Sequence, residues 1–453
     1  MGRPLTYIAG IGAAALALAA ATVPQTATAQ PAEPNKLTLA QIAALSPEAQ
    51  GRILDPLRAI AAAAGQAGKT TEADIYSSLK IDAPDGRVDV YLTDPSKAAD
   101  FIKAAKQVNK HIDATRITVL HAQYTLRALH AARNHLLAQE AAHQLPYKIY
   151  TAAVATDGSG LQVGVDKPDP ALAGTTRASS ATARRDSSTA ANVSGVSVTF
   201  SKSQHATTTS WSDTKWHDSS PYIGGDQLTD GNSYCSAGLP AVRTSDNKPF
   251  MITAGHCFTT GTEVFTGAGA TPTMGHYYDG LTGSTGNYVG TVASVSGPWD
   301  AETLSGSNNN SDESDSTTWH PVTSSGYSYN GDLVCQDGVA SFFMQQGTVC
   351  GIDVTNQDIT YSITDWSGTH NVRGVEGTRL SSNIPWAVAH GDSGTMVFSV
   401  SGSTRQARGI DSAGSGPCCY SYGTQGDMAF NYILWTEAPD ILGHFGMKLN
   451  PAT

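Results

Sequence analysis

Two short sequences carry side chains that can together break an acyl bond. Residues 253–257 place His256 beside Cys257, and residues 391–394 place Ser393 between an aspartate and a glycine. A serine hydroxyl is a weak nucleophile near neutral pH, so it needs an imidazole to accept its proton and a carboxylate to orient that imidazole. His256 and Ser393 therefore predict a nucleophilic serine with a histidine general base.

Asp300 is the carboxylate expected to complete this set. It lies between the two motifs in the chain, flanked by Trp299 and Ala301 in a strand-like setting. Asp279, in a turn-like sequence, is the alternative. Either motif alone is also typical of a turn or a packed residue, but the order histidine, aspartate, serine favours catalysis.

Many short strands must position these residues. From residue 222 the chain is rich in Ser, Thr and Gly, with short apolar runs at 264–265, 288–295 and 395–400. That pattern predicts an all-β barrel or sandwich.

The motifs resemble the histidine and serine signatures of chymotrypsin-like serine proteases. The chain from residue 222 onward is similar to their secreted bacterial branch, the streptogrisins and alpha-lytic protease. Further segments that carry the resemblance are 222–226, 334–335, 349–351 and 409–418. The resemblance implies an all-β catalytic domain of two six-stranded antiparallel β-barrels, and the activity of a serine endopeptidase that hydrolyses peptide bonds.

The resemblance also assigns roles around the nucleophile. It implies an oxyanion hole made by the backbone N–H groups of Gly391 and Ser393. It implies that Ser412, Ala413 and Gly414 pair with an extended substrate. Residues 385–389 carry no acid, so a medium to large apolar residue is expected before the cleaved bond. No cofactor and no metal is expected, since the acidic stretch 305–318 is interpreted as a solvated surface loop rather than a Ca²⁺ site.

Six cysteines lie in the second half of the chain, and an even number in an exported protein predicts a disulfide framework. The sequence alone leaves the pairing open. The resemblance implies the bonds Cys235–Cys257 and Cys335–Cys350. That leaves the adjacent residues Cys418 and Cys419, which either form a vicinal disulfide or stay reduced.

The first 29 residues predict an export signal. A single Arg3 precedes an apolar run from Ile8 to Ala21, and small residues follow it. This pattern is typical of a secretory signal peptide, too short in its apolar part to span a bilayer. We therefore expect a secreted, extracellular protein with no membrane partner.

Residues 30–170 predict a small α/β module. The spacing predicts helices at 37–64 and 95–110, mostly helix at 118–142, a strand at 88–92 and a hairpin at 147–165. By resemblance this module is a pro-segment that aids folding and inhibits the enzyme. A fold rich in non-local contacts forms slowly, which makes such a template useful.

Residues 171–221 predict a Ser- and Thr-rich linker ahead of the catalytic domain, residues 222–453. Cleavage during maturation is expected at Arg184–Arg185, or immediately before Tyr222 or Ile223.

Charge excludes one class of partner. Residues 222–453 contain 7 Lys and Arg against 21 Asp and Glu, within a net charge of −11 for the whole chain. So acidic a domain is poorly suited to nucleic acid, and we expect protein or peptide substrates.

Three departures from the family pattern are visible. Thr395 and Met396 follow the serine motif where glycine and proline are usual. Gln336 stands where a basic residue often balances Asp392, so a new amino terminus at Ile223 is one possible partner for that aspartate.

Two other functions stay open: a protease-like binding module without turnover, and a secreted esterase with the same triad.

Overall fold

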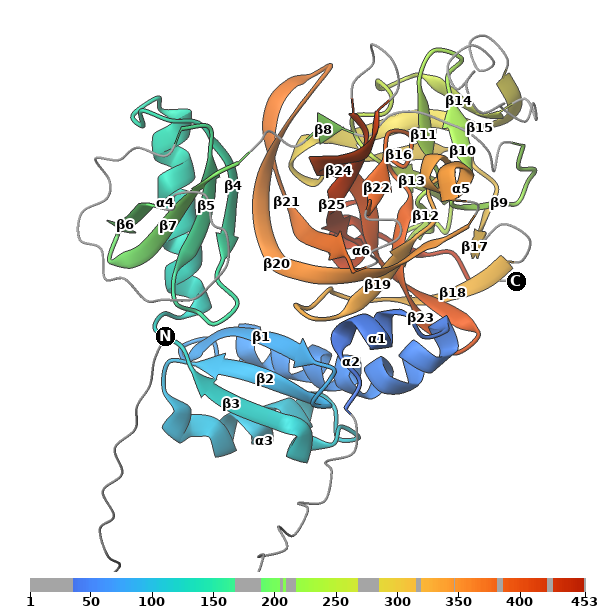
Figure 1. The fold of residues 1–453 in the computed structure, drawn as a ribbon. Helices are drawn as coiled ribbons and strands as arrows, with labels where there is room; N and C mark the ends of the chain where they lie inside the picture. Colours follow the sequence, from blue (N-terminus) through green and yellow to red (C-terminus); the bar gives the residue numbers. More distant parts are fainter. Residues whose placement is uncertain are drawn as a thin grey trace, which may run out of the picture. The chain divides into compact units, whose positions relative to one another are not determined.

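A small α/β module leads into a long series of strands in this computed structural model (Figure 1). The structure describes residues 36–167, 189–203, 207–208, 217–267, 285–314, 319–345, 347–380, 386–421 and 427–451. The expected signal peptide, Asp279 and the Arg184–Arg185 pair lie outside these residues. Leu37–Thr453 pack as one unit. Among the described helices, none combines the length and the apolar character needed to cross a bilayer.

The module begins with two helices beside a three-stranded sheet, in which β2 pairs antiparallel to β1 and parallel to β3. Ser46 caps the long second helix, and Pro47 occupies its first turn, where a missing N–H costs little. The single helix predicted over 37–64 is wrong: two helices separate at residues 44–46, where Pro47 begins the second, and apolar residues of both are buried. The elements are α1 (Leu39–Ala43), α2 (Pro47–Lys69), β1 (Tyr76–Asp82), β2 (Arg87–Leu92), η1 (Pro95–Lys97), α3 (Ala98–Val108), η2 (Ala114–Arg116) and β3 (Ile117–His121).

The prediction that 118–142 is mostly helix is confirmed, but the first residues of this range form a strand. Strand β3 occupies residues up to His121, because pairing with β2 decides the conformation of this β-branched stretch. Helix α4 (Leu126–Ala141) begins only after Thr125, whose hydroxyl accepts the Ala128 N–H at 3.2 Å.

The predicted hairpin is confirmed as β4 (Ile149–Val154) and β5 (Leu161–Val165), and helix α4 packs against it (Figure 1). Two more strands, β6 (Thr189–Val193) and β7 (Val196–Lys202), come from the segment expected to be a linker. Strand β7 runs parallel to β5 and buries Val196, Val198 and Phe200. Alternating apolar residues explain why this part of a Ser- and Thr-rich segment forms a strand.

An eight-stranded sheet has the strand order β11-β10-β14-β15-β16-β13-β12-β26. The histidine motif, residues 253–257, begins at the end of its strand β13. Its inward-facing residues form a core around Met251, Val264 and Leu304. The strands are β10 (Gln227–Thr229), β11 (Tyr234–Ser236), β12 (Leu239–Arg243), β13 (Pro249–Thr253), β14 (Glu263–Gly267), β15 (Thr285–Ser296), β16 (Ala301–Ser305) and β26 (Met447–Leu449).

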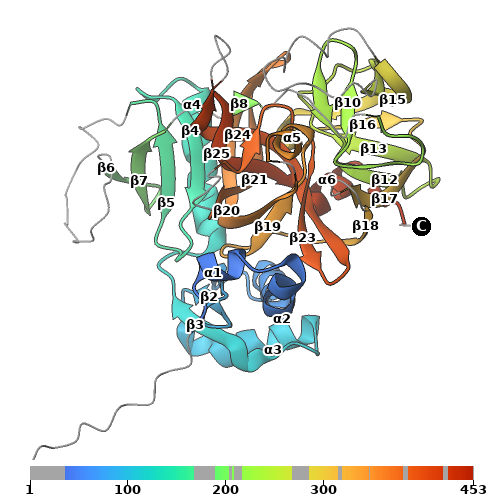
Figure 2. The ribbon, with the colours of Figure 1, turned by 45° about the vertical axis from the view of Figure 1, so that its right-hand side comes forward.

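Six further strands pair in a closed ring, visible together in Figure 2. In ring order they are β19 (Leu333–Gln336), β20 (Val349–Asp365), β21 (Gly368–Arg379), β25 (Asp427–Glu437), β24 (Thr404–Ser421) and β23 (Met396–Ser401), which pairs again with β19. Val397 and Trp435 are fully buried inside. The mainly β character expected from residue 222 onward is confirmed, and the arrangement as two six-stranded barrels stays a prediction.

The acidic stretch 305–318 was expected to be a surface loop, and part of it is a strand instead. Residues 309–314 form a strand in which Glu313 is buried and pairs with Arg405, Nε to Oε2 at 3.0 Å. Other short elements are β8 (Thr207–Thr208), β9 (Tyr222–Gly224), η4 (Gly297–Trp299), β17 (Asn309–Ser314), β18 (Trp319–Ser325), α5 (Val339–Gln345), β22 (Val388–Ala389) and α6 (Ala438–His444).

The module is attached to the ring by a strand pair and by a buried cation. Strand β4 pairs antiparallel with β20. On α2, Arg58 donates from Nε to Asp332 Oδ1 and from Nη2 to the Leu333 carbonyl, each at 2.8 Å. Asp332 also faces Arg408 Nη2 at 3.2 Å, and burial lowers the pKa of that arginine.

We predict that Arg58→Met destabilises the full chain by about 3 kcal/mol, because the fully buried Asp332 then loses one of its two cationic partners. Urea unfolding measures the change. Arg52→Met, an exposed position on the same helix, is the control and should shift the free energy of unfolding by less than about 0.5 kcal/mol. Equal stability of the two variants would contradict the buried attachment.

Candidate active site

Ser393, His256 and Asp300 form one hydrogen-bonded line. His256 Nε2 lies 2.8 Å from Ser393 Oγ, and His256 Nδ1 lies 2.9 Å from Asp300 Oδ2. The backbone N–H of His256 donates to the other carboxylate oxygen at 3.0 Å. All three residues are buried. The structure therefore brings together the three side chains that sequence reasoning selected from distant positions.

Two features hold the loop that carries His256. The loop follows strand β13, and the disulfide between Cys235 and Cys257 ties it to β11. Gly255 allows the loop that carries Asp300 to approach, since a Cβ at position 255 would lie only 2.8 Å from the Ala301 nitrogen. Any side chain there would separate His256 from its carboxylate.

The sequence suggested a strand-like setting for Asp300, but this residue lies outside the strands. It caps the short helix η4 with a φ of 38°, in the left-handed region, and β16 begins only at the next residue. This conformation costs a non-glycine residue on the order of 1 kcal/mol and aims the carboxylate at His256. Ser412 Oγ donates to Asp300 Oδ2 at 2.6 Å, so that oxygen accepts two hydrogen bonds. Sequence reasoning had given Ser412 only a role in pairing with substrate.

Asp392 fixes the turn before the nucleophile. Its carboxylate accepts the N–H of Ser341 at 2.9 Å, the N–H of Ala389 at 2.8 Å and the Gln336 side-chain amide at 3.3 Å, as well as the Ser341 hydroxyl. Asp392 therefore finds other partners than a basic residue, as expected, and Gln336 itself is one of them. An amide replaces the usual cation because several neutral donors together satisfy the carboxylate.

Ile223, whose new amino terminus is one possible partner for Asp392, makes a different contact in the full chain. Its N–H donates to Asp218 Oδ2 at 3.0 Å. Its neighbour Tyr222 donates its N–H to the Asn308 carbonyl at 2.9 Å.

Ser236 holds the backbone of the nucleophile turn, a role that sequence reasoning missed. Its hydroxyl donates to the Gly391 carbonyl and its N–H to the Ser393 carbonyl, each at 2.8 Å. Gly391 has a φ of 109°, and within the described part of the chain its N–H has no acceptor. Nothing in the sequence distinguishes Ser236 from any other serine next to a cysteine.

Residues 412–414, expected to bind substrate, lie in strand β24, and a segment of the same chain pairs with them. Thr207 is opposite Gly414 and Thr208 is opposite Ala413, in an antiparallel register. In the same register, the next residue of an extended peptide would lie opposite Ser412, whose hydroxyl donates to Asp300.

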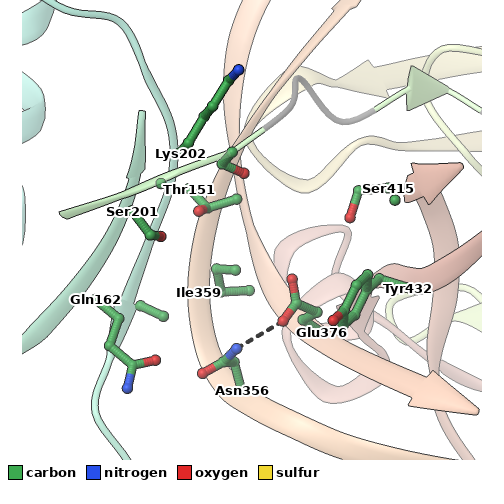
Figure 3. Close-up of a pocket in the computed structure, with 13 residues that line it drawn as sticks. Thr151, Gln162, Ser201, Lys202, Asn356, Ile359, Glu376, Ser415 and Tyr432 are labelled. Carbon is green, nitrogen blue, oxygen red and sulfur yellow. Dashed lines mark hydrogen bonds between the residues drawn. The ribbon is translucent and has the colours of Figure 1, made fainter. Parts of the chain in front are cut away.

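A pocket of about 550 Å³ lies beside the same strand, between β24 and the N-terminal module (Figure 3). Ser415 and Tyr432 line one side, and Ser201 and Lys202 at the end of β7 line the other. Glu376 on its wall accepts the Asn356 amide at 2.8 Å. The module and the expected substrate strand thus share one cavity.

The second disulfide implied by the resemblance, Cys335–Cys350, is also present and joins paired residues of β19 and β20. Cys418 is disulfide-bonded, and the side chain of Cys419 lies outside the described residues.

Among the described residues, two clusters of side chains that could bind a metal include members of the triad, and several of their ligand atoms are already engaged. The sulfurs of Cys235 and Cys257 beside His256 are bonded to each other. In the cluster of Asp300, Asp365 and His370, the Asp300 carboxylate already accepts hydrogen bonds from His256 and Ser412. These donors favour acid–base chemistry over metal binding.

Comparisons with known proteins give structural likenesses alone. No protein-family model and no curated protein matches the sequence. A Nocardiopsis protease is similar with a TM-score of 0.34 and 24% identity, over 50% of this chain and 98% of its own. Thermobifida fusca protease A gives 0.35 and 24%, over 51% and 98%. Chymotrypsin of Cellulomonas bogoriensis gives 0.34 and 26%, over 51% and 98%.

Asp392 predicts an unusual pH dependence of stability. Burial raises its pKa from 3.8 to about 6, so the folded state holds a proton that the unfolded state has released between those values. Asp392 therefore contributes stability that is fully present below about pH 4 and is lost as the pH rises to about 6, on the order of 3 kcal/mol in total.

The comparison with Asp392→Asn isolates this contribution, because asparagine does not titrate. We expect the variant to be more destabilised at about pH 4 than at about pH 7, in urea unfolding of the full chain. A difference that is constant with pH would contradict the raised pKa.

Proposed function

We propose that this protein is a secreted serine-type endopeptidase, made as a precursor, that hydrolyses peptide bonds through an acyl-enzyme. The observation that carries the proposal is the continuous hydrogen-bonded line from Asp300 through His256 to Ser393. A buried imidazole between a carboxylate and a serine hydroxyl is the arrangement that activates a serine.

The proposed reaction begins with proton transfer to His256. The Nδ1–H of the imidazole donates to Asp300, which leaves the Nε2 lone pair facing Ser393. Ser393 Oγ attacks the peptide carbonyl carbon as Nε2 takes its proton. His256 then passes that proton to the leaving amine as the C–N bond breaks. Water, deprotonated by the same nitrogen, releases the acid from the serine ester.

An oxyanion hole would stabilise the negative oxygen that forms at each addition step. We assign it to the N–H groups of Gly391 and Ser393, each worth on the order of 3 kcal/mol in the transition state. The hydrogen bonds from Ser236 to the carbonyls of Gly391 and Ser393 support this assignment, because they anchor the backbone of the two residues that carry these N–H groups.

Strand pairing supports a peptide rather than a simple ester as substrate. The backbone of β8 already pairs with Ala413 and Gly414. An extended substrate would add to this edge in the same way, through main-chain hydrogen bonds. Strand β8, which lies in the segment between the module and the catalytic domain, must leave this edge first, which supports inhibition of the precursor by its own N-terminal part.

The test compares a peptide amide with an ester that lacks any peptide. We expect the exported protein to turn over the peptide with the higher kcat/KM, because only the peptide can pair with residues 412–414. Ser393→Ala should lower kcat roughly 10⁴-fold or more, and the exposed control Ser294→Ala should have no effect. Faster turnover of the ester would favour an esterase. Activity that survives in Ser393→Ala would contradict the proposed nucleophile.

The register of β8 predicts where the precursor cuts itself. Thr208 pairs with Ala413 at the expected substrate edge, so the new amino terminus should follow Thr208 within a few residues. Ser393→Ala protein should be exported uncut. Sequencing of the mature amino terminus measures this. Cleavage at Arg184–Arg185 or before Ile223 that persists in Ser393→Ala would show that another protease matures the chain.

A further inference from the structure

We propose that Phe430 fills the pocket for the side chain that precedes the cleaved bond and restricts the enzyme to small residues there. This inference rests on the proposed peptidase function. It replaces the expectation of a medium to large apolar residue, which was drawn from the absence of an acid in residues 385–389.

Strand β25 forms the floor of this pocket. A substrate peptide would pair with residues 412–414 while Ser393 attacks it. The side chain of its residue before the cleaved bond would then lie between β24 and the residues just before the nucleophile. Strand β25 pairs with β24 on one side and with β22 on the other. Phe430 is the β25 residue in register with Val388, and its carbonyl accepts the Ala387 N–H at 2.8 Å.

The Phe430 ring fills the space above this floor. A Cβ on Gly414 would lie 2.4 Å from Cδ2 of the ring, so the ring rests directly against the backbone that pairs with substrate. The His390 ring, next to the nucleophile turn, meets it edge to face with centroids 5.2 Å apart. Phe430 is 4% exposed, which leaves little room between the two segments.

Packing makes this restriction firm. Phe430 belongs to the same buried core as Val388, Val397 and Trp435. A large substrate side chain could enter only by displacing the ring from that core, which costs several kcal/mol in well-packed interiors. Alanine, serine or threonine needs no such displacement.

The chain's own sequence is consistent with the restriction. Thr208 is the last described residue paired at the substrate edge, and Thr209 and Ser210 follow it in the sequence. Both have small side chains.

The test uses four peptide amides that differ only in the residue before the cleaved bond: alanine, threonine, leucine and phenylalanine. We expect the exported protein to prefer alanine over phenylalanine by roughly 100-fold in kcat/KM. Phe430→Ala should raise the ratio of phenylalanine to alanine turnover at least about 10-fold by opening the pocket. Phe430→Leu, which preserves more of the core, should change the ratio in the same direction.

Phe265→Ala is the matched control, since it removes the same side chain from the other sheet and should leave the ratio unchanged. Preference for phenylalanine or leucine in the unaltered protein, with no shift in either Phe430 variant, would overturn this inference and leave the peptidase proposal intact. Failure to cleave any of the four peptides would count against the peptidase proposal itself, and the inference would fall with it.

Discussion

The hydrogen-bonded line through His256 is the constraint on which the rest of this structure depends, because its members come from different sheets. His256 and Asp300 flank strands of the eight-stranded sheet. Ser393 lies between β22 and β23, which belong to the other large sheet. A hydrogen bond weakens steeply beyond its narrow range of length and angle. The two sheets must therefore be held to within a few tenths of an ångström, and the hydrogen bonds from Ser236 to the nucleophile turn and from Ser412 to Asp300 join them.

Strand β24 couples chemistry, binding and selectivity in one element. Ser412 orients the Asp300 carboxylate, the next two residues pair with an extended chain, and Gly414 supports the Phe430 ring. A shift of this strand would disturb all three together. Strand β8 of the same chain pairs with β24 while the triad hydrogen bonds stay intact, as the proposed precursor requires.

Motifs with strict chemical requirements could be predicted from the sequence. The triad residues were selected because their types and order permit few other readings, and the periodic segments gave the helices of the module and the hairpin. The features that could not be predicted depend on contacts between residues far apart in the sequence. No local signal shows that β2 would recruit residues 117–121 into a sheet, that Ser236 would hold the nucleophile turn, or that Gln336 and Ser341 would satisfy Asp392. Such roles exist only once distant segments meet.

Labelling of the exported, processed protein with a fluorophosphonate tests the central claim most directly, with the modified residue mapped by mass spectrometry. Only a serine that a neighbouring base activates reacts rapidly with this reagent. The account predicts a label on Ser393 that disappears in His256→Ala. Absence of labelling in the folded, processed protein, or a label on a different serine, would contradict it.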